Sequence, residues 1–238
     1  MVLRMLNRGE GQPKPSILVL MAALNEEEGI GPTLMEMKAV LSGCKFMVVD
    51  GNSADQTAVI AKKFGAEVLS QEGKGKGDAI KLGIQKAGPE EYKYVVLTDA
   101  DYTYPAEYVP RMIEILESNS SVGMVCGNRF NSHLHIGAMQ DYFYFGNRFI
   151  AFVHNMLNGV ALQDPLTGLR VVRWDILKNW QPKSASFDVE VELNHHVERR
   201  GYSISEIEIP YRHRLGEKKL KMRHGVTIIR RILSEFAY

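Results

Sequence analysis

Short apolar runs alternate with segments of helical spacing through the first half of the chain. Runs of this kind, rich in β-branched residues and bounded by turn residues, predict buried strands. The predicted strands are residues 17–22, 46–50, 66–69, 94–97 and 122–126. Between them, apolar side chains recur every three or four residues, which predicts helices. Because strands and helices take turns, we expect an α/β fold with a mostly parallel sheet and helices on both faces.

The pattern changes beyond Asn128. Residues 142–157 place aromatic and aliphatic side chains at helical spacing, which predicts an amphipathic helix, either packed in the core or lying at a membrane boundary. A short apolar strand is expected after the loop at 164–170, and residues 204–209 alternate as a strand does. Residues 226–233 form a cationic amphipathic segment that suits either a docked last helix or an interfacial helix over anionic lipid.

Composition narrows the class of protein. The chain has 238 residues, 45% hydrophobic and 24% charged, with a formal net charge of +1. These values fit one large α/β domain and indicate neither disorder nor a nucleic-acid partner. Cys44 and Cys126 lie in apolar runs and are expected to be free thiols in a reducing compartment. The sequence has neither an uncharged apolar stretch of about 18 residues nor the apolar segment of a signal peptide.

Two aspartates follow the predicted strand at 94–97. Asp99 and Asp101 stand two residues apart, where the strand gives way to a turn. In open α/β sheets, ligands bind outside the carboxyl ends of the strands. Carboxylate oxygens suit Mg²⁺ or Mn²⁺, which commonly also takes oxygens from a substrate diphosphate. The alternative is that the pair closes a turn and caps the next helix.

Acidic residues also follow two other predicted strands. Asn25 and Glu26 come after the first strand, and Asp50 ends the second. Parallel strands place these residues on one rim with Asp99 and Asp101, so that four carboxylates face one cleft. Several carboxylates on one rim require a cation or protonation. The pattern therefore favours a metal and diphosphate site over capping and turn roles.

Several segments of the sequence together resemble a known family. The segments that carry the resemblance are 23–27, 49–57, 73–77, 98–101, 127–130, Asp164 with 167–170, and 211–220. They look like the family 2 glycosyltransferases with the GT-A fold, and within that family like the dolichyl-phosphate mannose synthase group of polyprenyl-phosphate glycosyltransferases. The likeness covers about residues 17–220.

The resemblance implies a donor site. Ala23, Asn25, Glu26 and Asp50 would contact the nucleotide, and Lys76 in the glycine–lysine loop would lie near it, although such loops are often only solvated. Asp99 and Asp101 would hold Mg²⁺ or Mn²⁺ on the diphosphate of a GDP- or UDP-linked sugar. Relatives often have Gln where this chain has Thr103, so the third protein ligand stays open.

The resemblance also implies an acceptor site for a polyprenyl phosphate such as dolichyl phosphate. Donor and acceptor phosphates would meet basic side chains, since arginine matches phosphate oxygens in pairs. These are Arg129, Arg212, Arg214 and Lys219. Asp164 and Glu190 are candidates for ordering the acceptor, although a carboxylate in the position of Glu190, after Phe187, more often has a structural role. Lys218 and Lys221 are expected to lie on a solvated face. Asp101, Arg129 and Arg214 are expected to act most directly in catalysis.

The implied reaction is a metal-dependent, inverting transfer of mannose, glucose or N-acetylhexosamine at the cytoplasmic face of a membrane, with peripheral attachment. We expect a flexible tail at 1–15, a catalytic domain at 16–222 with its donor half at about 16–128 and its acceptor half at about 129–222, and a basic amphipathic helix at 223–238. Three alternatives remain: transfer to a soluble or glycan acceptor, a sugar-1-phosphate nucleotidyltransferase, and an inactive sugar-nucleotide-binding module.

Overall fold

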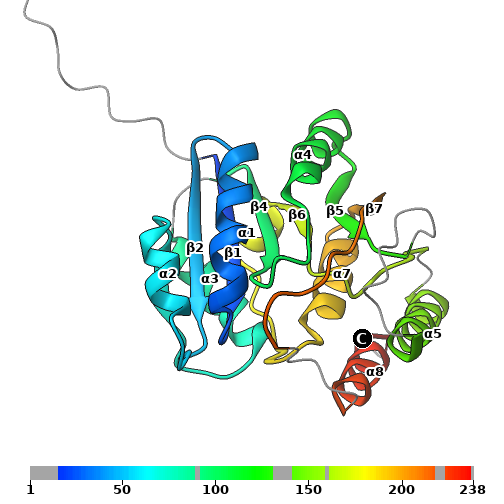
Figure 1. Cartoon of the computed structure of the whole chain (residues 1–238). Coiled ribbons are helices and arrows are strands. Elements are labelled where there is room, and N and C mark those ends of the chain that lie inside the picture. Colours follow the sequence, from blue (N-terminus) through cyan, green and yellow to red (C-terminus); the bar gives the residue numbers. More distant parts are fainter. Residues whose placement is uncertain (1–15, 89–91, 131–140, 159–160, 218–222, 237–238) are drawn as a thin grey trace, which may run out of the picture.

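A seven-stranded sheet with helices on both faces forms the body of the protein (Figure 1). The computed structural model describes residues 16–88, 92–130, 141–158, 161–217 and 223–236. The predicted tail at 1–15 and the basic residues Lys218, Lys219 and Lys221 lie outside these ranges. The strands are β1 Ile17–Ala23, β2 Cys44–Asp50, β3 Glu67–Ser70, β4 Tyr94–Asp99, β5 Val122–Asn128, β6 Arg170–Arg173 and β7 Ser203–Glu208.

The helices mostly match the predicted alternation. They are α1 Glu27–Val40, α2 Thr57–Lys63, α3 Lys76–Ala87, the 3₁₀ helix η1 Ala106–Tyr108, α4 Val109–Ser118, α5 Asp141–Asn158, α6 Trp174–Leu177, α7 Val189–Arg199 and α8 Arg223–Phe236. The expected helix at Pro105 differs in detail. Pro105 is extended, with ψ of 124°, and a 3₁₀ turn precedes the α-helix that begins at Val109.

The sheet is mostly parallel, which confirms the expected fold class. Its strand order is β3-β2-β1-β4-β6-β5-β7. β6 runs antiparallel to both β4 and β5, while the other strand pairs are parallel. The register places Ala23 beside Asp50 and Ala22 beside Asp99. The carboxyl ends of β2, β1 and β4 therefore lie side by side, as predicted for the residues that follow these parallel strands.

Each face of the sheet has its own hydrophobic core. Alternate residues of β1 point to opposite faces. Val19 and Met21 pack with α1 and α4, whereas Leu18 and Leu20 pack with α3 and α7. Packing from both faces fixes the sheet, and it thereby fixes the positions of the side chains that follow the strand ends.

A further pair of helices, α5 and α8, packs beside α7, and both lie at the lower right of Figure 1. A small cluster joins these elements, in which Ile150 of α5 and Ile228 and Ile232 of α8 bury against Val191 of α7. We call α5 and α8 the helical layer. The predicted aromatic helix at 142–157 is thus present as α5, although the structure describes only the backbone of residues 141–147. Among the described residues, no helix is long and apolar enough to cross a membrane.

Candidate active site

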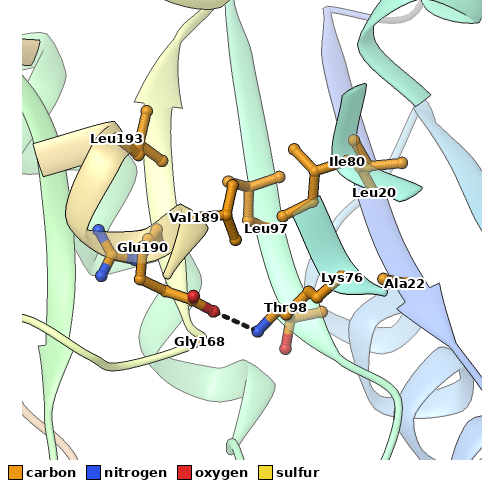
Figure 2. A pocket seen from close by; sticks show the side chains of 11 residues that line it. Leu20, Ala22, Lys76, Ile80, Leu97, Thr98, Gly168, Val189, Glu190 and Leu193 are labelled. Atoms are coloured by element: carbon orange, nitrogen blue, oxygen red, sulfur yellow. Dashed lines mark ion pairs between the residues drawn. The ribbon is translucent and has the colours of Figure 1, made fainter. Parts of the chain in front are cut away.

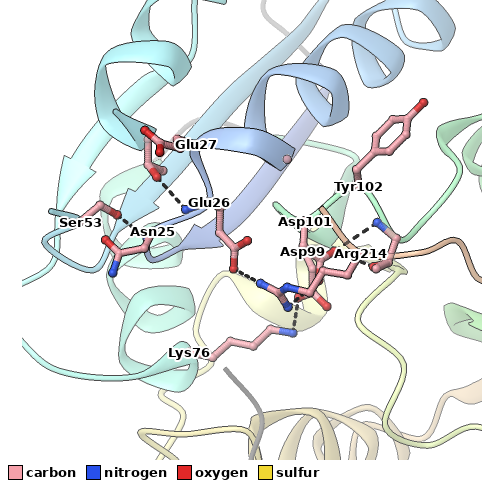
Figure 3. A network of polar contacts seen from close by, with 12 residues as sticks. Asn25, Glu26, Glu27, Ser53, Lys76, Asp99, Asp101, Tyr102 and Arg214 are labelled. Atoms are coloured by element: carbon pink, nitrogen blue, oxygen red, sulfur yellow. Dashed lines mark hydrogen bonds and ion pairs between the residues drawn. The ribbon is translucent and has the colours of Figure 1, made fainter. Parts of the chain in front are cut away.

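The two aspartates after β4 lie in a network of buried charges (Figure 3). Asp99 is the last residue of β4, and its Oδ1 is 2.6 Å from the Nζ of Lys76, the first residue of α3. Asp101 Oδ2 is 2.9 Å from Nη1 of Arg214. Arg214 also pairs with Glu26 through Nη2. The structure therefore brings together carboxylates from the ends of β1 and β4, and each is held by a cation from elsewhere in the chain.

Thr103 also holds Asp101 in place through two hydrogen bonds. The backbone N–H and the hydroxyl of Thr103 both donate to Asp101 Oδ1, at 3.1 and 2.6 Å. Burial and the neighbouring charge of Asp99 raise the pKa of Asp101. Burial also acts to raise the pKa of Asp99, but Lys76, Arg129 and Arg214 together outweigh it, and the pKa of Asp99 is lowered. Thr103 thus serves to orient Asp101 in this arrangement.

This pair has the chemistry of a divalent-cation site. Two adjacent carboxylates supply hard oxygen ligands, and their mutual repulsion is relieved when a cation lies between them. Lys76 and Arg214 provide that positive charge in the structure. No group of three or more His, Cys, Asp or Glu side chains suited to one ion occurs among the described residues. The residues fit an ion that takes its remaining ligands from a diphosphate and water.

The ends of β1 and β2 form a second part of the site. Asn25 has a positive φ of 50°, and its Oδ1 accepts a hydrogen bond from the backbone N–H of Ala54. Asp50 is buried and accepts hydrogen bonds from the hydroxyl and the N–H of Ser53, at 2.5 and 3.1 Å. The carbonyl of Ala23 accepts from the N–H of Gly51 at 2.8 Å. The two strand ends are therefore tied to each other.

Lys76 lies between two carboxylates. Its Nζ is 2.6 Å from Asp99 Oδ1 and 2.6 Å from Glu190 Oε1 of α7. Burial lowers the pKa of Lys76, but the two carboxylates outweigh it and raise the pKa above its ordinary value. Figure 2 shows the pocket beside this pair, bounded by Lys76, Glu190 and apolar side chains such as Leu97. The glycine–lysine loop thus delivers a largely buried side chain, 14% exposed, to the site.

Arg129 and Asp164 form a buried ion pair next to the aspartates. Arg129 Nε and Nη2 donate to the two carboxylate oxygens of Asp164 at 2.6 and 2.8 Å. The guanidinium lies over the ring of Tyr211, 5.2 Å from its centroid. Asp164 therefore contacts Arg129 directly and holds it in one orientation. The charge of Arg129 also contributes to the lowered pKa of Asp99.

The loop from Asp164 to Arg170 is folded around a second buried arginine. Arg170 donates to the carbonyls of Pro165 and Thr167 and to Asn194 Oδ1. A Cβ on Gly168 would come within 2.4 Å of Asp99 Oδ2, so only glycine lets this loop approach the carboxylate so closely.

The segment after β7 crosses the aspartate turn. Arg212 and Leu215 donate backbone hydrogen bonds to the carbonyls of Thr103 and Asp101, each at 3.1 Å. The Arg214 side chain reaches Asp101 and Glu26, whereas Arg212 pairs with Glu36 of α1 and lies over the ring of Tyr102. The two predicted arginines therefore have different neighbours, and only Arg214 contacts the aspartate pair.

Several residues of this network were not predicted as site residues. Ser53 and Thr103 hold the predicted aspartates, and Arg170 shapes the loop beside Asp99. Glu190 was predicted only as a candidate for ordering the acceptor. Its partner Lys76 is 114 positions away in the numbering of the chain. The contact between two residues so far apart cannot be predicted from spacing in the sequence. Ser53 and Thr103, in contrast, are close in sequence to the aspartates that they contact.

The fold is of the mostly parallel α/β class with carboxylates at its strand ends, and comparison with known proteins identifies the family. The sequence profile of Glycosyl transferase family 2 matches residues 18–181. The chain therefore belongs to glycosyl transferase family 2, and it is a glycosyltransferase.

Two relatives come from Haloferax volcanii. A dolichyl-phosphate hexose transferase is 34% identical over 206 residues, which cover 86% of each protein. The low-salt glycan biosynthesis hexosyltransferase Agl6 is 28% identical over 211 residues, covering 87% of this chain and 50% of that protein. The chain thus spans nearly all of the first relative but only half the length of the second.

Solved structures agree on the fold. The glucosyl-3-phosphoglycerate synthase of Mycobacterium tuberculosis, in complex with Mn²⁺, UDP-glucose and phosphoglyceric acid, superposes with a TM-score of 0.74. The two chains are 21% identical, and the match covers 94% of this chain and 80% of the synthase. This similarity confirms the GT-A type of α/β fold.

Proposed function

We propose that this glycosyltransferase moves a hexose from a nucleotide-sugar to a polyprenyl phosphate such as dolichyl phosphate. The main support is the 34% identity to a dolichyl-phosphate hexose transferase over 86% of both chains. The structure supplies a matching set of charges. Carboxylates suited to a metal–diphosphate group lie at the ends of β1, β2 and β4, and two arginines suited to phosphates, the buried Arg129 and the half-buried Arg214, lie beside them.

The donor would bind over the strand ends. Asp99 and Asp101 would hold Mg²⁺ or Mn²⁺. The glucosyl-3-phosphoglycerate synthase, which shares the fold, has been solved with Mn²⁺ or Mg²⁺ and UDP, which supports a divalent ion at this site. When bound, the ion supplies positive charge that stabilises the departing nucleoside diphosphate. Lys76 is close enough to Asp99 to contribute further positive charge. We assign the nucleotide contacts to Ala23, Asn25, Glu26 and Asp50.

The acceptor phosphate would approach from the side of Arg129 and Arg214. Asp164 fixes Arg129, and Arg214 spans Glu26 and Asp101, so that both guanidinium groups border the aspartate pair. Arg212 and Lys219 are also proposed to contact phosphate; Lys219 lies outside the described residues. A lipid phosphate is already an anion near neutral pH, so it can attack the anomeric carbon without a strong base. A single displacement of this kind inverts the configuration of that carbon.

The helical layer is the proposed membrane-facing part. Phe149, Phe152 and Met156 of α5 and Leu233 of α8 are 52–64% exposed, which is unusual for large apolar side chains. Arg148 and Arg230 are exposed on the same two helices. Apolar side chains with neighbouring cations suit the interface of an anionic membrane. We propose peripheral binding at the cytoplasmic face, with residues 16–222 as the catalytic domain and 223–238 as the membrane-associated segment.

A panel of GDP- and UDP-linked hexoses offered with dolichyl phosphate tests the proposal. The expected product is a glycolipid that forms only with Mg²⁺ or Mn²⁺, and Asp101→Ala should reduce its formation at least about 100-fold. Asp175→Ala, which removes an exposed carboxylate at the start of α6, is the matched control. Transfer to 3-phosphoglycerate but not to lipid would instead establish a soluble acceptor. An Asp101→Ala enzyme as active as the parent would contradict the metal assignment.

A further inference from the structure

Glu190 is a buried carboxylate that contacts the site through one oxygen only. Its side chain extends from the first turn of α7, and Oε1 is 2.6 Å from Lys76 Nζ. The residue is 6% exposed. Its second oxygen, Oε2, is buried and has no hydrogen-bond partner among the residues that the structure describes. A buried carboxylate oxygen without a donor is costly, and such an atom calls for an explanation.

The same ammonium group that reaches Glu190 also contacts Asp99, and both ion pairs measure 2.6 Å. A lysine ammonium has three N–H donors and rotates freely about its last bond. Only a small shift of Lys76 is needed to exchange its contact with Asp99 for a second contact with Glu190. The unpartnered Oε2 is the acceptor that such a shift would use (Figure 2).

The backbone holds Lys76 and Glu190 at a fixed separation. Gly77, next to Lys76, packs so closely that a Cβ would lie 2.0 Å from the carbonyl oxygen of Ser184, just ahead of α7. The carboxylate of Glu192 in α7 accepts hydrogen bonds from the backbone N–H groups of Lys183 and Ser184, each at 2.7 Å. The starts of α3 and α7 are therefore locked together. Lys76 can move between its two carboxylates, while the carboxylates keep their places.

A divalent ion on Asp99 would conflict with Lys76. The ammonium lies within hydrogen-bond distance of the carboxylate that is proposed to bind the ion. Two positive charges on the same carboxylate repel each other strongly in a site of low dielectric constant. Arg214 stands in the same relation to Asp101, where it also contacts Glu26, so Lys76 is the cation whose displacement concerns Asp99.

We propose that Glu190 is a positioning residue that receives Lys76 when it leaves Asp99 and so frees Asp99 for the divalent ion. The inference rests on the proposed function, because it takes Asp99 as a metal ligand. In the metal-free protein Lys76 bridges the two carboxylates. In the metal-bound protein Lys76 pairs with both oxygens of Glu190, and its charge stays beside the diphosphate without competing for the ion.

Mn²⁺ titration followed by electron paramagnetic resonance tests this role without an activity assay. The titration is run on the full chain with saturating UDP or GDP, for the parent, Glu190→Gln, Lys76→Met and the double variant. Glu190→Gln leaves Lys76 on Asp99, so we expect Mn²⁺ affinity to fall about tenfold. In the Lys76→Met background the same substitution should leave Mn²⁺ affinity unchanged. Glu190→Asp keeps the charge but shortens the reach, and an intermediate affinity is expected.

Asp188→Asn is the matched control, because it removes another buried carboxylate at the start of α7 that contacts Arg231 and not Lys76. It should leave Mn²⁺ affinity unchanged. Equal losses from Glu190→Gln with and without Lys76 would overturn the proposal, because Glu190 would then act on the ion by its charge alone. An unaltered affinity in Glu190→Gln, or parental affinity in Glu190→Asp, would also overturn it. Failure of the parent to bind Mn²⁺ would overturn both the metal assignment and this role.

Discussion

The strand-end site and the helical layer differ in whether their side chains find partners within the protein. At the ends of β1 and β4, Glu26, Asp99 and Asp101 each have a cationic partner within the protein. In the helical layer, the large apolar side chains of Phe149, Phe152 and Met156 remain exposed. In the first region these three carboxylates are paired with cations, whereas in the second region the residues that the structure describes leave apolar area uncovered.

This difference follows from the demands of each region. Buried carboxylates are tolerated only with compensating charge, and fixed charges in a buried site need no reorganisation when a substrate arrives. A helix at a lipid interface, the role proposed for the helical layer, must in contrast keep apolar area available for lipid. Under the proposed function, substitutions at the site act through lost ion pairs, while substitutions on the exposed face of the layer act on membrane binding alone.

The largest stability effect is expected from breaking the buried pair beside the site. Asp164→Asn leaves the charge of Arg129 buried without its carboxylate. Removing one member of a buried pair typically costs 3–5 kcal/mol, so we expect the free energy of unfolding to fall by about 3 kcal/mol or more. Urea denaturation measures the change, with an unaltered m-value as the sign that the folded and unfolded states are otherwise comparable.

The exposed pair of Asp175 and Lys178 supplies the control for this substitution. Both side chains are largely solvated, so Asp175→Asn should change the free energy of unfolding by less than about 0.5 kcal/mol. If Asp164→Asn were as stable as Asp175→Asn, the Arg129–Asp164 pair would not be the rigid element that this comparison assigns to the site.

A smaller, pH-dependent effect is expected where the helical layer meets the catalytic domain. His154 of α5 and His195 of α7 are buried with their ring centroids 5.5 Å apart. Burial lowers the pKa of each to about 4, and nearby Arg170 and Arg199 act in the same direction. An unfolded histidine titrates near 6.5, so below that pH the unfolded chain binds more protons than the folded one. Stability is therefore retained above about pH 6.5 and lost as the pH falls toward 4.

The double variant His154→Gln with His195→Gln isolates this contribution. The parent should lose about 2.5 kcal/mol more than the variant between pH 7 and pH 5.5. Urea denaturation across that range gives the difference directly. Carboxylates such as Glu198, whose pKa is raised by burial to about 7, titrate in both proteins and cancel in the comparison. Parallel stability curves for the two proteins would show that the histidines are already protonated or solvated in the fold.

Most of the fold was predictable, because its information is local. Apolar runs with β-branched residues marked β1 to β5, and the parallel arrangement followed from the alternation of strands and helices. The adjacency of Asp50, Asp99 and the residues after β1 followed in turn from the common direction of their strands. The short helix α6 and the 3₁₀ turn before α4 were not predicted, because a segment of three or four residues is too short to show the helical repeat of apolar positions.

The partners of the predicted site residues could not be derived in the same way. Lys76 meets Glu190 and Arg214 meets Glu26 only because the sheet brings distant segments together. Sequence reasoning supplied the carboxylates and the arginines but not their pairing. Asp164 illustrates the difference: it was predicted at the acceptor site, and the structure places it on Arg129, where it orients a side chain predicted to bind phosphate.

The smallest effect, and the one that isolates the helical layer, is expected from its exposed face. Phe152 is 61% exposed on α5, so Phe152→Gln should leave the free energy of unfolding nearly unchanged but weaken binding to anionic phospholipid vesicles about tenfold, as loss of one inserted aromatic side chain implies. Co-sedimentation with vesicles measures this. Met35→Gln, at a 58% exposed apolar position on α1 outside the layer, is the matched control and should bind as the parent does. If both variants lost binding equally, the exposed apolar side chains of α5 would have no special role, and the contrast between the two regions would not extend to the membrane.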